Sequence, residues 1–267
     1  MKGDIVIFRG GGDVATGSIQ KLHRAGFRVL VLEVEKPLCI RRTVACARVI
    51  EEGRGKIEDF IATRCTDELD IYMAWEKDEV PVIVDPKGEM IKKFHPMAVI
   101  DAIIAKKNLG THKEMAPITI ALGPGFVAGT DVDVVIETNR GHDLGRLIFD
   151  GKAEENTGNP GNILGYTTER VLRSPGNGKI KVLKTIGDTV KKGETLALVQ
   201  KKEVKAGLDG MIRGMITDGY SVTKGLKIGD VDPRINLRNT LTISDKARNI
   251  GGATLEAVLI MKRRKNL

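Results

Sequence analysis

Aromatic residues are scarce in this chain of 267 residues: they make up 4% of it, with a single tryptophan. Proteins that bind single-stranded nucleic acid stack its bases on aromatic side chains, so this composition disfavours nucleic acid as a partner. Long apolar runs are also missing, because no stretch approaches the roughly 20 residues that a membrane-spanning helix needs. We therefore expect neither a nucleic-acid partner nor a membrane.

Cysteine is rare too, with Cys39, Cys46 and Cys65 as the only three. Their number is odd, and neither a CxxC pair nor a Cys/His spacing typical of structural zinc is present. The start of the sequence carries no signal-peptide pattern. These features predict a cytoplasmic protein with no bound metal, in which Cys46 is either a small core residue or, as a weak candidate, a reactive thiol.

Familiar catalytic motifs are lacking as well: the sequence has no G-x-S-x-G elbow, no H-E-x-x-H helix and no Walker loop. The catalytic residues therefore stay unknown, and His142 is a weak candidate for an acid or base, with a plain surface histidine as the alternative. The net charge is +8. It indicates either a solvated basic surface or attraction to anions, such as a phosphorylated cofactor or an acidic partner.

Hydrophobic runs predict alternating strands and helices in the first part of the chain. We expect strands at residues 4–8, 28–34, 80–84, 118–122 and 132–137, and helices at residues 14–24 and 97–106. Apolar strands that alternate with helices are typical of a parallel sheet covered on both faces. We therefore predict an α/β, Rossmann-like cofactor-binding domain over residues 1–150.

A second domain is expected over residues 151–240, where short strands and glycine-rich turns prevail. Here the pattern G-x-x-V-x-K-G occurs at residues 187–193 and again at 219–225, each time before an apolar strand. Two such copies resemble the half-units of a β-rich barrel-sandwich (biotinyl/lipoyl-like) domain. Residues 241–267 should form a C-terminal helix that packs back on the first domain, with Ser244 as its N-cap.

The main functional motif is a glycine-rich loop, G-x-G-x-x-A, directly after the first expected strand. Glycines there allow a tight turn and close approach to phosphate oxygens, which the N-terminus of the following helix attracts. Glu33 ends the second strand, where an acidic residue can bind a ribose hydroxyl. We expect Asp13 to cap the helix and Thr16 to offer a hydroxyl donor. The candidate cofactor-binding residues of the loop are Gly10, Gly11, Gly12, Asp13, Val14, Ala15, Thr16 and Gly17.

Other loops should border the same crevice if the strand directions hold. Ligands of such sheets bind at the carboxyl ends of the strands. Arginines beyond the second strand could grip a phosphate in bidentate fashion, or form a solvated pair. The additional binding candidates are Arg41, Arg42, Gly123, Pro124, Gly125, Phe126 and Arg140. The alternative for each glycine loop is a turn that only connects a strand to the next element.

Five motifs occur in an order that resembles a known family. They are RGGGDVATG (residues 9–17), PLCIRRTVA (37–45), ALGPGFVAG (121–129), ETNRGHDLGR (137–146) and NTGNPGNILGYTTERVLRSPGNG (156–178). Together they resemble the YqeB-type accessory proteins of the selenium-dependent molybdenum hydroxylase system. The segment Ala45-Cys46-Ala47-Arg48 departs from the family pattern.

The resemblance implies an accessory or maturation protein whose partner is a molybdenum hydroxylase client or its maturation machinery. Its ligand would be a phosphorylated small molecule: an unknown nucleotide, with molybdopterin dinucleotide or NAD(P) as candidates. Two alternatives stay open, an NAD(P)-dependent oxidoreductase and a non-catalytic interaction module. The sequence decides neither whether the protein is an enzyme nor whether it forms a homo-oligomer.

Overall fold

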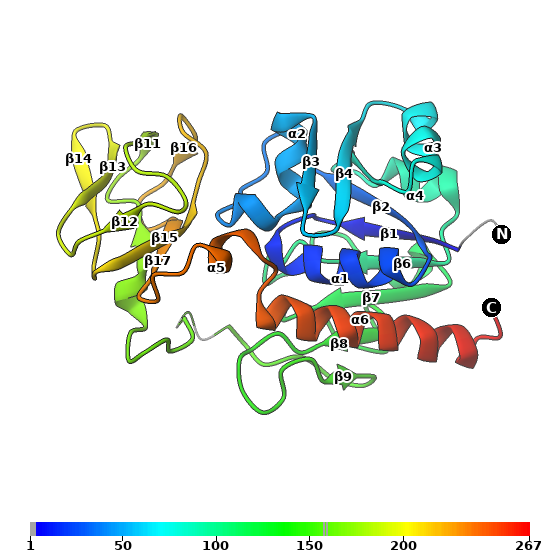
Figure 1. Ribbon diagram of the computed structural model, residues 1–267. Coiled ribbons are helices and arrows are strands. Elements are labelled where there is room, and N and C mark those ends of the chain that lie inside the picture. Colours follow the sequence, from blue (N-terminus) through cyan, green and yellow to red (C-terminus); the bar gives the residue numbers. More distant parts are fainter. Residues whose placement is uncertain (1–3, 157, 159) are drawn as a thin grey trace. The chain divides into compact units, whose positions relative to one another are not determined.

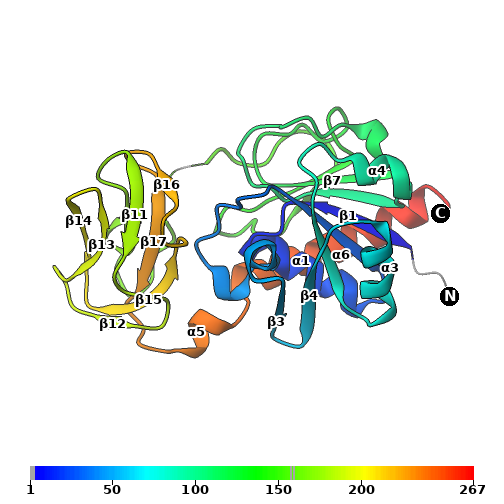
Figure 2. The same ribbon diagram turned by 90° about the horizontal axis from the view of Figure 1, so that it is seen from above.

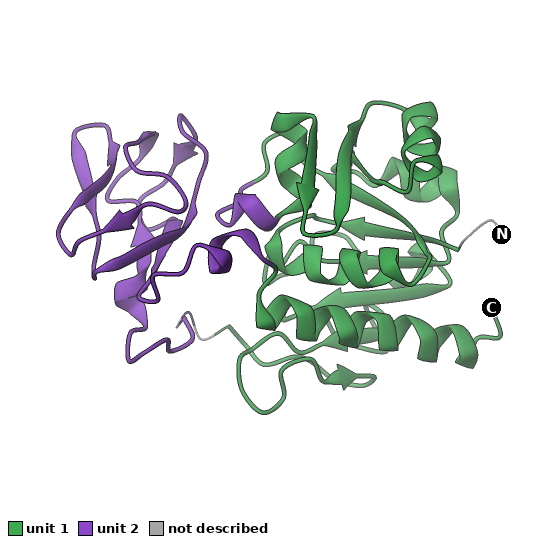
Figure 3. Cartoon of the chain, viewed as in Figure 1, with its two compact units in different colours: residues 1–37, 45–156, 243–267 green, residues 38–44, 157–242 purple. Residues whose placement is uncertain are grey.

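The computed structural model describes residues 4–156, 158 and 160–267 (Figure 1). Thr157 and Asn159, which belong to the last motif quoted above, lie outside the described residues. The chain divides into two compact units (Figure 3). Unit 1 contains residues 1–37, 45–156 and 243–267, and unit 2 contains residues 38–44 and 157–242. The chain therefore leaves unit 1 after Pro37, returns at Ala45, and leaves it a second time near residue 156.

Unit 1 is built on a nine-stranded sheet in the order β3-β4-β5-β2-β1-β6-β7-β8-β9. Its strands are β1 (Ile5–Arg9), β2 (Arg28–Glu33), β3 (Arg54–Ile57), β4 (Phe60–Cys65), β5 (Val80–Val84), β6 (Ala98–Asp101), β7 (Ile118–Leu122), β8 (Val134–Ile136) and β9 (Leu147–Ile148). The strands from β4 to β8 in this order pair in parallel. The two edge strands, β3 and β9, pair antiparallel with their neighbours.

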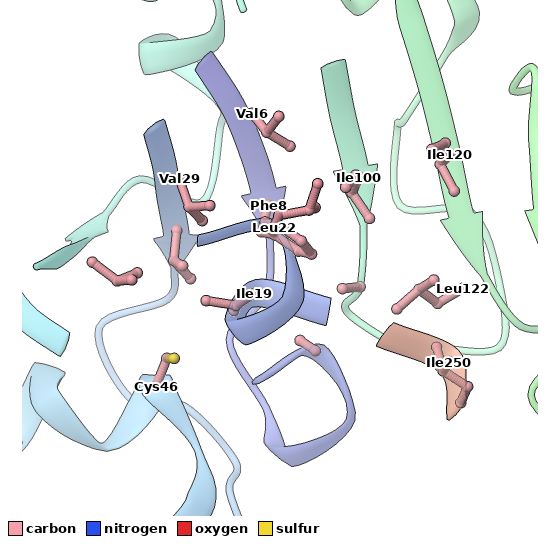
Figure 4. Packing of buried hydrophobic residues seen from close by; sticks show 14 of the residues in the cluster. Val6, Phe8, Ile19, Leu22, Val29, Cys46, Ile100, Ile120, Leu122 and Ile250 are labelled. Carbon is pink, nitrogen blue, oxygen red and sulfur yellow. The ribbon is translucent and has the colours of Figure 1, made fainter. Parts of the chain in front are cut away.

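Helices cover both faces of this sheet because side chains along a buried strand alternate between its faces. Val6 and Phe8 of β1 pack in one core with Ile19 and Ile250 from the helices of that face (Figure 4). Ile7 belongs to a second core on the other face. The helices of unit 1 are α1 (Asp13–Arg24), α2 (Val49–Glu52), α3 (Glu68–Glu76), α4 (Glu89–Phe94) and α6 (Asp245–Arg264), with 3-10 turns η2 (Cys46–Arg48) and η3 (Lys113–Met115).

α1 and α6 cross in close contact and lie side by side on the sheet (Figure 1), and Figure 2 gives the view from above. Gly17 makes the crossing possible, because an added Cβ there would overlap the carbonyl of Ala247. A Cβ at Gly251 would in turn overlap the carbonyl of Gly17. Buried hydroxyls of Ser18 and Thr254 share a hydrogen bond of 2.8 Å across the same contact. Across the described residues, no helix is long and apolar enough to pass through a bilayer.

The helix expected at residues 97–106 is wrong. Residues Ala98–Asp101 form the central strand β6 between β1 and β7, and all four are buried. A short apolar run buried on both sides looks the same in sequence whether it is a strand or a core helix. Residues 102–106 of the expected helix belong to the loop that leaves β6.

Unit 2 contains two four-stranded antiparallel sheets, β10-β17-β15-β12 and β14-β13-β11-β16. Their strands are β10 (Val171–Arg173), β11 (Gly178–Val182), β12 (Thr189–Val190), β13 (Thr195–Val199), β14 (Lys202–Lys205), β15 (Gly210–Met215), β16 (Ser221–Val222) and β17 (Lys227–Asp232). The unit also holds the short helix α5 (Arg238–Leu241) and the 3-10 turns η1 (Arg42–Val44) and η4 (Thr168–Arg170). Buried aliphatic side chains from both sheets form its core.

These sheets correct the fold predicted from the sequence. The Rossmann-like parallel sheet was wrong, because the sheet of unit 1 is mixed: its edge strands run antiparallel and are too short or too polar to stand out in sequence. The biotinyl/lipoyl-like barrel-sandwich domain was wrong as well. The two copies of the repeat contain β12 and β16, which pair with β15 and β11 in separate sheets. A local repeat fixes turns, whereas sheet pairing depends on distant partners.

The α1–α6 crossing yields a stability prediction. Gly17→Ala should lower the free energy of unfolding by about 1–3 kcal/mol, because its new methyl group forces the two backbones apart. The control is Gly252→Ala on α6, where an added Cβ meets nothing within 4 Å. That change should be neutral or stabilise by up to about 1 kcal/mol, since alanine favours a helix. Urea denaturation measures both; equal effects of the two changes would contradict the role of Gly17.

Candidate functional site

Three loops of unit 1 meet at the edge of the sheet where the parallel strands end. They are residues 10–12 after β1, residues 102–107 after β6 and residues 123–126 after β7. A Cβ at Gly10 would lie 2.9 Å from the Cα of Ile103, and one at Gly125 would lie 2.6 Å from the Cα of Lys107. The middle loop therefore touches both of its neighbours, and glycine permits the approach on each side. We call these three loops the rim.

The glycine loop is held together by its own neighbours. The N–H of Gly11 donates to Oε1 of Glu33 at 2.7 Å, and the N–H of Val34 donates to Oε2 of the same carboxylate at 2.9 Å. The carbonyl of Gly11 accepts from the N–H of Ala47 at 2.9 Å. Burial raises the pKa of Glu33, while the two N–H donors act in the opposite direction. Glu33, predicted to bind a ribose, thus fixes the loop.

The side chains of the first turn of α1 face inward. Thr16 is fully buried: its hydroxyl donates to the carbonyl of Gly12 at 2.9 Å and accepts from the N–H of Cys46 at 3.0 Å. Val14 and Ala15 pack on the core. The N-cap is Gly12, so the capping role expected for Asp13 was wrong; Asp13 is the first residue of the helix. Its negative charge there offsets the attraction that the helix N-terminus exerts on anions.

The loop after β7 lines a pocket of about 370 Å³. Pro124, Gly125 and Phe126 form part of its wall, and Lys106 and Lys152 line it as well. The other lining residues are Val127, Ala153, Glu155 and Asn156. Gly123 stands next to this wall at φ +81°, where an added Cβ would lie 2.6 Å from the hydroxyl of Thr138. A pocket with two lysines and one carboxylate suits a small anion.

A buried polar network anchors the loop that supplies Lys106. Asp101, at the end of β6, accepts from the hydroxyl of Thr111 at 2.5 Å, and its carboxylate lies 3.8 Å from the guanidinium of Arg9. Burial raises the pKa of Asp101. The loop in between has Ile104 at φ 57° and Lys106 at φ 62°. Left-handed backbone at non-glycine residues costs of order 1–3 kcal/mol each and is found most often at functional sites.

Arg140 and His142 lie away from this pocket, in the loop after β8. Arg140 forms a bidentate ion pair with Asp245, both contacts at 2.9 Å, which ties the loop to the first turn of α6. His142 lines a second, open hollow of about 460 Å³, together with Asp143, Leu144, Gly145, Arg146, Asn249, Ala253 and Glu256. Neither Arg140 nor His142 therefore belongs to the site formed by the three rim loops.

Arg41 and Arg42 belong to unit 2. Arg41 is buried, and its Nη2 donates to the carbonyls of Asn239 and Thr242, both at 3.0 Å. Nε of Arg42 donates to the carbonyl of Met215 at 3.0 Å. Both guanidinium groups thus hold the segment 38–44 within unit 2.

Cys46 is fully buried, and burial raises the pKa of its thiol to about 12. A thiol with this pKa stays protonated at neutral pH and is a poor nucleophile, which leaves it as a core residue. Among the residues that the structure describes, no group of three or more His, Cys, Asp or Glu side chains is arranged to hold a metal ion.

No family model matches the chain. It is, however, 48% identical over 257 residues to a protein of Escherichia coli (strain K12) named "Uncharacterized protein YqeB". The aligned region covers 96% of this chain and 48% of that protein. Over the aligned region the chain is therefore similar in sequence to YqeB. It spans about half the length of that relative, so the remainder of YqeB has no counterpart in the alignment.

Solved structures give only weak likenesses. The product-bound ectoine utilization protein EutE (DoeB) from Ruegeria pomeroyi has 11% identity and a TM-score of 0.27, covering 86% of this chain and 85% of that chain. A succinylglutamatedesuccinylase/aspartoacylase from Rhodobacter sphaeroides has 11% identity and a TM-score of 0.28, covering 86% and 84%. At these TM-scores the likeness carries no argument for the activity of this chain.

The glycine loop predicted a Rossmann-like, nucleotide-binding protein, and this prediction also needs correction. Within the chain itself, the acid expected at a ribose is bonded to the loop, and the hydroxyl expected at a phosphate is turned inward. Gly10 and Gly11 allow close packing against Ile103 and Val31, and such packing glycines produce the same sequence pattern as a phosphate loop.

The buried thiols give a chemical test. In the native protein at pH 8, the thiol reagent DTNB should label none of Cys39, Cys46 and Cys65, because all three are buried. Full labelling should follow only in denaturant. Mass spectrometry of the labelled peptides identifies each site. Rapid labelling of Cys46 in the folded protein would contradict a pKa near 12.

Proposed function

We propose that this chain acts by binding rather than by chemistry, and that it holds a small anionic molecule in the pocket beside the loop after β7. The observation that carries the proposal is the pair of lysines, Lys106 and Lys152, in a pocket at the carboxyl edge of a largely parallel sheet. Ligands of open α/β sheets gather at this edge, where loops from successive strands converge.

Charge and shape both support an anion. The residues that line the pocket include two lysines and one acidic residue, Glu155, so its lining has a net positive charge. Pro124 and Gly125 of the loop after β7 also line the pocket, and the buried ring of Phe126, which is 4% exposed, adds an apolar surface to it. A ligand with an apolar body and one or two acidic groups, phosphate or carboxylate, fits these surroundings.

Our proposal for the wider role follows the resemblance of the five motifs. The chain would serve as an accessory protein of a selenium-dependent molybdenum hydroxylase in the cytoplasm, with a hydroxylase client or its maturation machinery as its partner. The relationship to YqeB supports a shared role with that protein over the region they have in common. The buried, unbridged cysteines agree with a reducing compartment.

Charge removal in the pocket tests the binding site. Lys106→Met and Lys152→Met keep the length of the side chain and remove its charge, so each should weaken binding of inorganic pyrophosphate or succinate by about tenfold. Lys107→Met is the matched control, because this exposed lysine belongs to the same loop and does not line the pocket. Isothermal titration calorimetry measures the affinities. Equal affinities for all three variants and the unmodified protein would rule the pocket out.

The accessory role has a separate test in cells. In a strain that depends on this chain, the Lys106→Met/Lys152→Met double variant should reduce hydroxylase activity, whereas Lys107→Met should support it fully. Western blotting verifies equal amounts of each variant. Full hydroxylase activity in a strain that lacks the chain altogether would refute the accessory role and leave the binding site untouched.

A further inference from the structure

The positive charge of this protein is carried by unit 2. Residues 38–44 and 157–242 contain 17 Lys and Arg residues against 8 Asp and Glu, a net charge of +9. The rest of the chain contains 26 against 27, a net charge of −1. Within unit 2, residues 170–187 and 219–229 together contain seven Lys and Arg and no Asp or Glu. An acidic partner is therefore attracted to the surface that these two segments form.

Three turns between neighbouring strands of unit 2 lie close together. They connect β10 to β11, β13 to β14 and β16 to β17, and consist of residues 174–177, 200–201 and 223–226. The first and the third are hydrogen-bonded: the N–H of Gly225 donates to the carbonyl of Ser174 at 2.8 Å, and the N–H of Ser174 donates to the carbonyl of Leu226 at 2.9 Å. The second turn approaches the first, because a Cβ at Gly178 would lie 3.0 Å from Cγ of Gln200. We call the surface of these three turns the turn surface.

Five cationic residues lie in these turns or next to them: Arg173, Lys201, Lys202, Lys224 and Lys227. Arg173 and Lys227 are directly opposite each other in the antiparallel pair of β10 and β17, so their side chains share one face of that sheet. The guanidinium group of Arg173 donates to the carbonyl of Gly225 in the third turn at 3.0 Å. Lys202 reaches the first turn, where a Cβ at Gly176 would lie 3.8 Å from its Nζ. The turn surface thus gathers positive charge from three separate parts of the chain.

No carboxylate of the protein neutralises this group. Four of the five side chains are exposed, and Lys227 is half-buried. In the part of the chain that the structure describes, none of the five forms an ion pair with an Asp or Glu. Other lysines of unit 2 do: Lys184, Lys191 and Lys205 each lie within 3.0 Å of a carboxylate. The positive charge of the turn surface is therefore left for a partner.

The kind of side chain indicates the kind of partner. Four of the five cations are lysines, which carry a compact charge on a flexible stem and bind carboxylates without a fixed geometry. They are spread over three turns, so they suit an extended acidic surface better than one small anion. The turns contain no aromatic residue on which a nucleic-acid base could stack. An acidic segment of a protein has the matching chemistry.

We propose that the turn surface of unit 2 docks an acidic segment of a partner protein. The proposal goes beyond the pocket with Lys106 and Lys152, and it holds whether or not that pocket takes a ligand. Ion pairs between exposed charges are individually weak, but complementary charge speeds the encounter of two proteins. The complex should therefore form quickly and weaken as the ionic strength rises.

A fluorescein-labelled peptide of ten glutamates serves as the probe, with fluorescence anisotropy of the full chain as the measurement. The triple variant Lys201→Gln/Lys202→Gln/Lys224→Gln should bind the peptide about tenfold more weakly than the unmodified protein, because three exposed ion pairs are lost. These three side chains are exposed, so the fold should be kept, and circular dichroism verifies this.

The matched control removes the same number of charges from the opposite end of the strands. Lys191 and Lys192 precede β13, whereas Lys201 follows it, and Lys184 follows β11, whereas the first turn precedes it. Five residues of strand span about 16 Å, twice the Debye length of about 8 Å at physiological ionic strength. The variant Lys184→Gln/Lys191→Gln/Lys192→Gln should therefore lose less than about twofold in affinity.

Three results would overturn the proposal. Equal losses in the two triple variants would mean that the peptide responds only to net charge. A DNA duplex that binds the unmodified protein more tightly than the peptide, in the same buffer, would make nucleic acid the partner. Loss of peptide binding in Lys106→Met/Lys152→Met would move the site to unit 1. A loss confined to the variant of the turn surface supports docking of an acidic protein there.

Discussion

At Gly10, Gly17 and Gly125 the backbone of unit 1 comes closer to neighbouring backbone than any side chain would allow. The first of these contacts brings the loop after β1 against the loop after β6, the second lets α6 lie on α1, and the third joins the loops after β6 and β7. Because each contact is made by backbone, the distances are fixed by the fold and leave little freedom for side-chain adjustment. The last of these contacts also fixes the loop after β7, which lines the pocket with Lys106 and Lys152.

The two units differ in their electrostatic character. Unit 1 has a net charge close to zero. Its two pocket lysines, Lys106 and Lys152, therefore act on a ligand only at short range. Unit 2 carries the excess charge of the protein, and part of it is buried among carbonyl groups.

Much of the architecture of unit 1 could be read from the sequence, because apolar runs such as Ile5–Arg9 are strong local signals. Ser244 was expected as an N-cap and accepts from the N–H of Ala247. The two lysines of the pocket escaped notice, since Lys106 fell in a stretch expected to be helical and Lys152 lay beyond the expected domain boundary. The role of Glu33 could not be foreseen either: an acid that binds a ribose and an acid that binds its own loop occupy the same position in sequence.

The order of the chain has a consequence for how the protein is made. α6 supplies Ile250, Ala257 and Val258 to the main core of unit 1, but it follows all of unit 2 in the sequence. During synthesis the sheet of unit 1 therefore leaves the ribosome long before α6, the helix that completes its core. The apolar face of the sheet that α6 covers stays exposed while unit 2 is translated. Such long-range closure slows folding and exposes surface that can aggregate. A chaperone that shields this face during translation would act on the step most at risk.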